Sequence, residues 1–263
     1  MTITTISWGC GVQSTTLAVM SALGYLPKVD AVITSDTQWE SNRTYEHRDF
    51  YTRWLTAHGI PVYITTGGNI RQLGAEEHIH IPFWTQDGGP LHRQCTYNFK
   101  IQPIRRLIRT VFDLPNIPAP GTVELWIGFS LDEWQRMKPS RVKFIKNTWP
   151  LIDKRMSRND CIDLLQSHGL PVPIKSACLG CPYRQPTEWL ELNNAELSDV
   201  ISFDEENRHN PLVGCGSTTS ALYVYKYRRV VPLRDADLEH DAHHERTARQ
   251  LPLMICEEGY CHV

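Results

Sequence analysis

The first 68 residues alternate between strand-like and helix-like segments, and this alternation constrains the fold more than any other feature of the sequence. Runs of apolar and β-branched residues at 2–8, 29–37 and 60–68 are typical of strands. The segments between them, 13–25 and 42–59, are typical of helices that end at a glycine. A β-α-β-α-β order favours a parallel sheet with helices on both faces. We therefore expect an α/β fold with a doubly wound, mostly parallel sheet, whose ligand binds beyond the carboxyl ends of the strands.

The alternation continues to about residue 210. We expect a strand at 122–130 and helices at 99–113, at 156–169 and, as one or two helices, at 186–209. Ser157 followed by Asp160 resembles a capping box at the start of the helix at 156–169. From about residue 211 short apolar and charged pieces are mixed, and no regular element is predicted.

The chain is long enough, at 263 residues, to bury a sizeable core without help from a metal or a disulfide. Its net charge of -2 gives no global basic field, so any contact with nucleic acid must come from a local patch. The start "MTITTIS" lacks the basic flank and apolar core of a signal peptide, and no run of about 18 apolar residues follows. We expect a cytoplasmic protein with no membrane partner.

The first turn between strand and helix is rich in glycine and hydroxyl residues, "GCGVQSTT" at 9–16. Backbone N–H groups of Gly9 and Gly11, with Ser14 and Thr15 at the positive end of the following helix, can form an anion site. No Gly-Lys-Ser/Thr follows, so this is not a Walker loop. The residues alone leave two interpretations open: a phosphate-binding loop or a plain strand-to-helix turn.

The same stretch resembles the pyrophosphate-binding PP-loop, SGGxDS[ST], of the adenine nucleotide alpha-hydrolase superfamily. The motif is occupied in order by Gly9, Cys10, Gly11, Val12, Gln13, Ser14 and Thr15. Three positions depart from the motif: Gly9 replaces a serine, Cys10 replaces a glycine and Gln13 replaces the aspartate. The last change removes a charge, so nucleotide binding is expected while turnover is not implied by the loop alone.

Three further segments resemble the phosphoadenosine phosphosulfate (PAPS) reductase family within this superfamily. "SDTQWE" at 35–40 resembles its DTG-E segment, and "RQCTYNFKIQPIRR" at 93–106 resembles Cys-Cys-x-x-x-K-x-x-P-[LI]. "WIGFSLDEWQRMKPSR" at 126–141 resembles Gly-[IV]-x-x-x-E-x-x-R. The resemblance implies a HUP/PP-loop ATPase-like fold with a nucleotide-binding core at 1–150 and a C-terminal helical and irregular region, bearing a CxxC and a Cys-rich tail, at 151–263.

The resemblance also assigns roles to residues. It implies that ATP or a related adenine nucleotide, with Mg²⁺, binds to Gly9, Gly11, Val12, Gln13, Ser14, Thr15 and Gly128. Asp36 is expected to place the nucleotide or the magnesium ion. Lys100 and Arg136 are expected to neutralise the charge that develops during reaction.

Eight cysteines are present: Cys10, Cys95, Cys161, Cys178, Cys181, Cys215, Cys256 and Cys261. Without a secretion signal, metal binding or redox chemistry is favoured over disulfides, and Cys161 is expected to be a small buried hydrophobe. The resemblance implies that Cys95 joins Cys178 and Cys181 of "CLGC" as ligands of a [4Fe-4S] cluster with one open iron. A zinc site completed by Cys95, Cys215 or a histidine is the lesser alternative.

The function implied is that of a PP-loop ATP pyrophosphatase that adenylates a substrate for sulfur transfer. The expected acceptor is nucleic acid, as in DNA phosphorothioation or thiolation of a tRNA base, and the expected partners are a cysteine desulfurase or other sulfur donor and a second copy in a homodimer. One alternative is a PAPS or adenylylsulfate reductase that uses Cys256 or Cys261 of the tail as a nucleophile. Another is a non-catalytic nucleotide-binding regulator.

Clusters of basic, histidine and tryptophan residues complete the candidate features. The basic residues could bind a second nucleotide phosphate or a nucleic-acid backbone, or they could simply face solvent. They are Arg105, Arg106, Arg109, Lys138, Arg141, Lys143 and Lys146. His240, His243 and His244 have metal-like spacing, but we expect them to face solvent. Trp126 and Trp134 are expected in the core and the pocket wall instead of stacking on bases.

Overall fold

The computed structural model describes residues 2–76, 81–85, 90–208, 220–221, 223–226 and 229–248. These residues form two compact units. Unit 1 contains residues up to 67 together with 97–176, and unit 2 contains 68–96 and the described residues from 177 onward. The chain therefore passes between the units after residues 67, 96 and 176. The division of the chain at residue 150 stays a prediction about its functional regions.

Unit 1 is built on a five-stranded sheet with the order β3-β2-β1-β5-β6. The strands are β1 (Ile3–Ser7), β2 (Ala31–Asp36), β3 (Val62–Thr66), β5 (Val123–Ile127) and β6 (Ile145–Thr148). Every neighbouring pair in this sheet is parallel. The crossovers run outward from β1 in both directions, so the predicted doubly wound α/β fold is confirmed.

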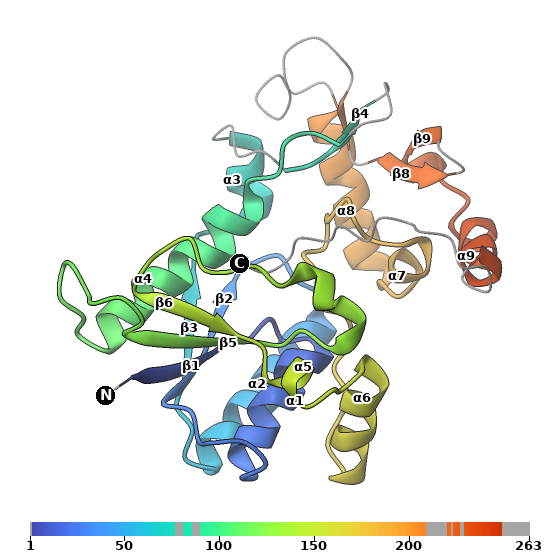
Figure 1. The fold of residues 1–263 in the computed structure, drawn as a ribbon. Coiled ribbons are helices and arrows are strands. Elements are labelled where there is room, and N and C mark those ends of the chain that lie inside the picture. The colour runs from blue at the N-terminus through green and yellow to red at the C-terminus, as the bar shows by residue number, and fades with distance from the viewer. Residues whose placement is uncertain are drawn as a thin grey trace. The chain divides into compact units, whose positions relative to one another are not determined.

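Helices cover both faces of this sheet (Figure 1). One face carries α1 (Val12–Ala22), α2 (Asn42–Ala57), the short α5 (Pro150–Asp153) and α6 (Arg158–Ser167). The other face carries α4 (Gln102–Val111), which continues from a π-helical turn, η1 (Tyr97–Ile101). A 3-10 turn, η2 (Leu131–Arg136), follows β5.

The alternation of side chains along each strand separates two hydrophobic cores. On β2, Val32 packs in the core that contains α1, α2 and α6, whereas Ile33 packs in the core that contains α4. On β5, Trp126 and Leu125 divide in the same way. Cys161 is fully buried in the first core, which confirms its predicted structural character.

Local signals in the sequence set several helix ends. Ser41 begins α2 by accepting a hydrogen bond from the Thr44 amide, at 3.3 Å. The capping box predicted for α6 is confirmed, because Ser157 and Asp160 bond each other's backbone amides. These hydrogen bonds satisfy amides that have no partner inside the helix.

Unit 2 consists of short elements. They are α3 (Ile70–Glu76), β4 (Trp84–Thr85), α7 (Pro186–Leu190), α8 (Asn194–Asn207), β7 (Ser220–Ala221), β8 (Tyr223–Lys226), β9 (Arg229–Pro232), the 3-10 turn η3 (Leu233–Asp235) and α9 (Leu238–Ala248). Strands β4 and β7, and strands β8 and β9, form antiparallel pairs. The prediction of one or two helices across 186–209 is confirmed by α7 and α8, but the prediction of no regular element beyond 211 is wrong. Among the described helices, none combines the length and the apolar character needed to cross a membrane.

Candidate functional site

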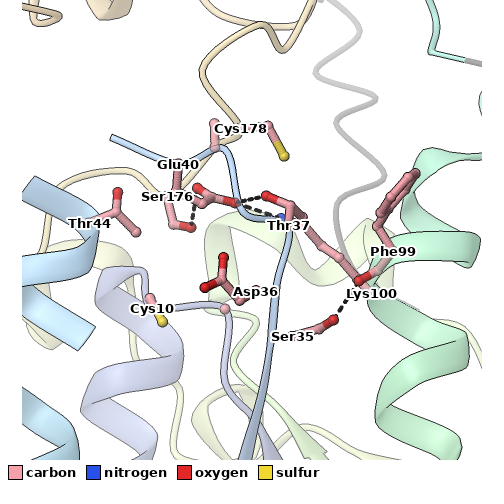
Figure 2. A network of polar contacts seen from close by, with 12 residues as sticks. Cys10, Ser35, Asp36, Thr37, Glu40, Thr44, Phe99, Lys100, Ser176 and Cys178 are labelled. Carbon is pink, nitrogen blue, oxygen red and sulfur yellow. Dashed lines mark hydrogen bonds and ion pairs between the residues drawn. The ribbon is translucent and has the colours of Figure 1, made fainter. Parts of the chain in front are cut away.

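A pocket lies at the carboxyl ends of the strands of unit 1, where doubly wound sheets bind ligands. Its polar walls come from the loop after β1, the end of β2, and side chains of α2, η1, α4 and β6. The polar and charged side chains that line it include Asp36, Glu40, Tyr45, Arg48, Lys100, Arg105, Ser140, Asn147 and Ser176. Figure 2 shows Cys10, Asp36, Glu40 and Lys100 in this region.

The loop after β1 is held by its own hydroxyl side chains. The Gly9 amide donates to Ser14 Oγ at 3.2 Å, and the Trp8 indole N–H donates to Thr15 Oγ1 at 2.9 Å. The first intrahelical bond, Thr15 N–H to the Gly11 carbonyl, is 3.0 Å long. No side chain caps Gly11, and the first turn of α1 has no acidic residue. The positive end of α1 therefore keeps its attraction for an anion.

Gly128 lies against the start of α1. A Cβ at this position would be 2.5 Å from the Ser14 amide nitrogen and 2.6 Å from Ser14 Cα. Both are backbone atoms that cannot turn away, so only glycine fits. The motif residue Gly128 thus lets β5 approach the predicted phosphate loop closely.

Cys10 occupies the motif's glycine position and adopts the backbone conformation that glycine favours, with φ of 58°. Such a conformation costs a non-glycine residue roughly 1–2 kcal/mol. The thiol is 7% exposed, and its sulfur lies 3.7 Å from Thr34 Oγ1. Burial raises the pKa of the Cys10 thiol to about 12, so this cysteine stays protonated near neutral pH.

Gln13, at the position of the motif's aspartate, bridges two charged side chains. Its amide nitrogen donates to Glu133 Oε2 at 3.1 Å, and its amide oxygen accepts from Arg158 Nη1 at 3.1 Å. Glu133 also pairs with Arg136, whose guanidinium lies 4.7 Å from the ring centroid of Phe129. Arg136 therefore belongs to a network around Gln13 and is outside the described lining of the pocket.

Asp36, at the end of β2, is held by three donors. Its Oδ2 pairs with Arg48 Nη1 at 2.8 Å, and its Oδ1 accepts from the Gln38 amide at 2.7 Å and from the Tyr45 hydroxyl at 3.1 Å. Burial, together with the Asp36 carboxylate, raises the pKa of Tyr45 to about 12. A cation that bound Asp36 would have to compete with Arg48, which sequence analysis did not identify.

Glu40 is a buried carboxylate with partners on three segments (Figure 2). Its Oε1 lies 3.6 Å from Lys100 Nζ and accepts from Thr37 Oγ1 at 3.2 Å, while its Oε2 accepts from Ser176 Oγ at 3.4 Å. The ion pair holds Lys100 at the wall of the pocket.

Arg105 also lines the pocket from α4. Burial, with a smaller contribution from the charge of Arg141, lowers the pKa of Arg105. Among the residues that the structure describes, the charged groups that influence the pKa of Arg105 are Tyr97 and Arg141, and neither is a carboxylate. A half-buried guanidinium without a carboxylate partner attracts the anionic or acceptor groups of a ligand.

The predicted cluster ligands Cys95, Cys178 and Cys181 all belong to unit 2. Each is half-buried and free of disulfides, and the Cys181 amide donates to the Cys178 carbonyl at 3.1 Å, which closes the CxxC turn. Arg184 supports this turn by donating to the carbonyls of Ala177, at 2.8 Å, and of residue 179, at 3.0 Å.

Two contacts join the segment before Cys95 to the segment after the CxxC turn. The Trp84 indole donates to the Pro182 carbonyl at 3.0 Å, and the Arg93 guanidinium lies 5.2 Å from the ring centroid of Tyr183. Within the described ranges, however, no three His, Cys, Asp or Glu side chains are grouped as metal ligands. Thiolates are suitable donors for an iron–sulfur cluster, but the described chain does not present these three cysteines as an assembled ligand set.

Several other candidates have clear positions. His240, His243 and His244 lie on α9 and are exposed, as expected. Trp126 is buried as expected, whereas Trp134 is 60% exposed, so the prediction that it forms core or pocket wall is wrong. Cys215, Cys256 and Cys261 lie outside the described residues.

The strand order and the position of the pocket define the class: a doubly wound α/β protein with a pocket beside the loop after β1. No protein-family model matches the chain, and no curated protein matches it in sequence. Among solved structures, the chain is similar to a phosphoadenylyl-sulfate (PAPS) reductase from Candida auris in a phosphate complex. That likeness has 12% sequence identity and a TM-score of 0.44, and it covers 66% of this chain and 76% of the reductase.

The chain is also similar to the U34-tRNA thiolase NcsA from Methanococcus maripaludis with its [4Fe-4S] cluster. The identity is 16% and the TM-score 0.42, and the likeness covers 80% of this chain and 66% of the thiolase. Both proteins are members of the PP-loop superfamily, the superfamily that the sequence motifs resemble.

Proposed function

We propose that this chain is a PP-loop ATP pyrophosphatase that binds ATP in the pocket of unit 1 and adenylates an acceptor for sulfur transfer. The observation that carries the proposal is the composition of the pocket. The loop after β1 lies at the uncapped end of α1, and three cationic side chains, Arg48, Lys100 and Arg105, line the same pocket. Backbone amides and cations in one pocket favour a polyanion such as a nucleotide phosphate chain.

The residues of the pocket suit cleavage at the α-phosphate. An acceptor oxygen attacks the α-phosphorus, and pyrophosphate leaves with the electron pair of the broken P–O bond. We assign Lys100, held by Glu40, to stabilise the charge that grows on the phosphate oxygens. The amides between Gly9 and Thr15 are assigned to the pyrophosphate, since those of Gly9 and Thr15 themselves donate within the loop. ATP enters with Mg²⁺ on its phosphates.

In the second step hydrosulfide, which a thiol reductant releases from the persulfide of a donor such as a cysteine desulfurase while the thiol is oxidised to a disulfide, attacks the adenylated atom. AMP leaves with the oxygen and the electron pair of the broken bond. An iron–sulfur cluster held by Cys95, Cys178 and Cys181 would supply an iron able to carry sulfide, which is the chemistry that sulfur transfer requires. Zinc at these thiols is the alternative. A homodimer and a cytoplasmic location stay predictions.

A basic segment beside the pocket supports a nucleic-acid acceptor, such as a DNA backbone or a tRNA base. Lys138, Arg141, Lys143 and Lys146 are exposed, while Trp134 offers an exposed aromatic face on the same segment. The segment's acidic residues are already bonded: Asp132 accepts from the Arg158 amide, and Glu133 pairs with Arg136. Exposed cations with an aromatic side chain are typical of surfaces that bind single-stranded nucleic acid.

Release of pyrophosphate from ATP by the anaerobically purified full-length protein, with Mg²⁺ and single-stranded DNA or tRNA, tests the proposal. We expect Lys100→Met to lower the rate by roughly 100-fold or more, because a preorganised charge is lost. Lys154→Met, at an exposed lysine of unit 1, is the matched control and should keep the rate. Sulfite release from PAPS would instead support the reductase, and tight ATP binding without pyrophosphate release would support the regulator.

Iron and sulfide analysis of the same preparation tests the cluster. We expect iron and acid-labile sulfide in the wild type and their loss in Cys95→Ala, because a three-ligand site cannot retain a cluster well with two thiolates. Cys161→Ala, at a cysteine buried in the core, is the control and should keep its iron. Stoichiometric zinc without iron, or full iron in Cys95→Ala, would contradict the ligand set.

A further inference from the structure

Asn147 is a polar side chain on an apolar face of the sheet. It shares one face of β6 with Ile145, and in the parallel register it stands beside Leu125 of β5. This is the face that packs on α4, where the neighbouring strand residues Leu125, Ile127 and Ile145 are apolar. Asn147 is only 6% exposed. An amide in such a position needs hydrogen-bond partners for both of its ends.

One end of the Asn147 amide has a partner and the other does not. Its Nδ2 donates to the Lys138 carbonyl at 3.0 Å. Because a carbonyl can only accept, this bond fixes which end of the amide is nitrogen. The carbonyl oxygen, Oδ1, is buried and has no hydrogen-bond partner among the residues that the structure describes. The side chain lines the pocket of unit 1, so a ligand in that pocket can supply the missing donor.

The surroundings of Asn147 indicate the kind of ligand group that supplies this donor. The apolar side chains of Ile101, Ile104, Leu125 and Ile145 line the same pocket and offer flat contacts to a ring. Arg105, from α4, lines it too and presents N–H donors without a hydrogen bond or ion pair to any described residue. One buried acceptor and one set of donors suit a planar heterocycle that carries an amino group next to a ring nitrogen.

We propose that Asn147 reads the base of the bound nucleotide by accepting a hydrogen bond from its exocyclic amino group, with Arg105 donating to a ring nitrogen. This inference rests on the proposed function, which makes the base adenine. Discrimination follows from the buried acceptor: a base without the amino group cannot donate a hydrogen bond to Oδ1.

Equilibrium binding to the full-length protein tests this inference with three nucleotides: ATP, purine riboside triphosphate, which lacks the amino group, and 3′-deoxy-ATP. We expect the wild type to bind ATP roughly tenfold more tightly than purine riboside triphosphate. Asn147→Leu, similar in size but without an acceptor, should bring that ratio close to one. Lys154→Met, at an exposed lysine of unit 1 outside the pocket lining, should keep the wild-type ratio.

A second readout needs no ligand. Asn147→Leu should raise the melting temperature of the free protein, because an apolar side chain replaces a buried acceptor to which no described residue donates. Should this variant not fold, Asn147→Ser, which is too short to reach the same donor, is used for the binding series.

Three results would overturn the inference while leaving ATP binding intact. They are a wild type that binds ATP and purine riboside triphosphate equally, a variant that keeps the wild-type ratio, and a variant whose discrimination changes only against 3′-deoxy-ATP, which would place a ribose hydroxyl at Asn147. A wild type that binds none of the three nucleotides would instead contradict the proposed function, and the inference with it.

Discussion

At the scale of single residues, the substitution in the phosphate-loop motif has a physical explanation. Gln13 donates to Glu133 and accepts from Arg158, both at 3.1 Å. An aspartate at this position has no N–H to donate and would place a second carboxylate beside Glu133. The neutral amide therefore suits a loop whose neighbours already include one carboxylate and one guanidinium.

The first prediction restores the motif's aspartate. We expect Gln13→Asp to lower the free energy of unfolding by about 1–2 kcal/mol, because a donated hydrogen bond is replaced by repulsion between two carboxylates. Urea denaturation of Gln13→Asp, Glu133→Gln and the double variant measures this as a double-mutant cycle. The double variant should recover about 1 kcal/mol relative to the sum of the single changes. Additive effects would show that the two side chains are not coupled.

The site was only partly predictable from residues taken one at a time. Asp36, Lys100 and Gly128 stand in segments that resemble known motifs, and the structure places the first two in the pocket lining and the third against the loop. Arg105 and Asn147 reach the pocket because of the fold. No local pattern distinguishes a buried pocket asparagine from a surface asparagine, so the signal exists only once β6 is paired with β5.

At the scale of elements, the contact between the end of β5 and the first turn of α1 shapes the loop after β1. A Cβ on Gly128 would meet backbone atoms of Ser14 at 2.5 and 2.6 Å. Real Cβ contacts are never so short, and a helix turn cannot move without disturbing Ser14 and the bond that it makes to the Gly9 amide.

The second prediction tests this contact. We expect Gly128→Ala to lower the free energy of unfolding by about 2–4 kcal/mol, since overpacking against backbone forces strands and helix apart. Gly11→Ala is the matched control in the same region: its Cβ meets nothing within 4 Å, and the cost should be about 1 kcal/mol or less. Urea denaturation measures both. Equal losses in the two variants would argue against a steric role for Gly128.

Helices and strands were more predictable from the sequence where the hydrophobic pattern extends over many residues. The predicted strands and helices of the first 68 residues coincide with β1, α1, β2, α2 and β3, because several turns or a continuous apolar run support each one. Strand β6 was missed, since Lys146 and Asn147 interrupt its apolar character. Helix α9 was missed because its buried face rests on few residues, among them Ala242, within a charged segment.

At the scale of the whole molecule, Glu40 contacts residues close to two places where the chain passes between the units. These crossings follow residues 96 and 176. Lys100 lies shortly after the chain enters unit 1 at residue 97, and Ser176 is the last residue before it leaves. Both are bonded to the same carboxylate at the end of the pocket. The segments that carry Cys95 and Cys178 therefore lie next in the chain to residues that Glu40 contacts. No sequence motif indicated the contact between Glu40 and Ser176.

The third prediction removes the charge of this carboxylate. We expect Glu40→Gln to lower the free energy of unfolding by about 1–3 kcal/mol, because a buried ion pair is broken while hydrogen bonding to Thr37 and Ser176 remains possible in part. Hydrogen–deuterium exchange should rise at residues 97–101 and 172–176, next to the two crossing points, and stay unchanged in β1 and β3. Glu46→Gln, at an exposed glutamate of α2, should alter neither quantity. A uniform increase across unit 1 would mean that Glu40 stabilises the unit as a whole. An increase confined to the two segments would mean that Glu40 specifically holds the chain of unit 1 next to the two crossing points.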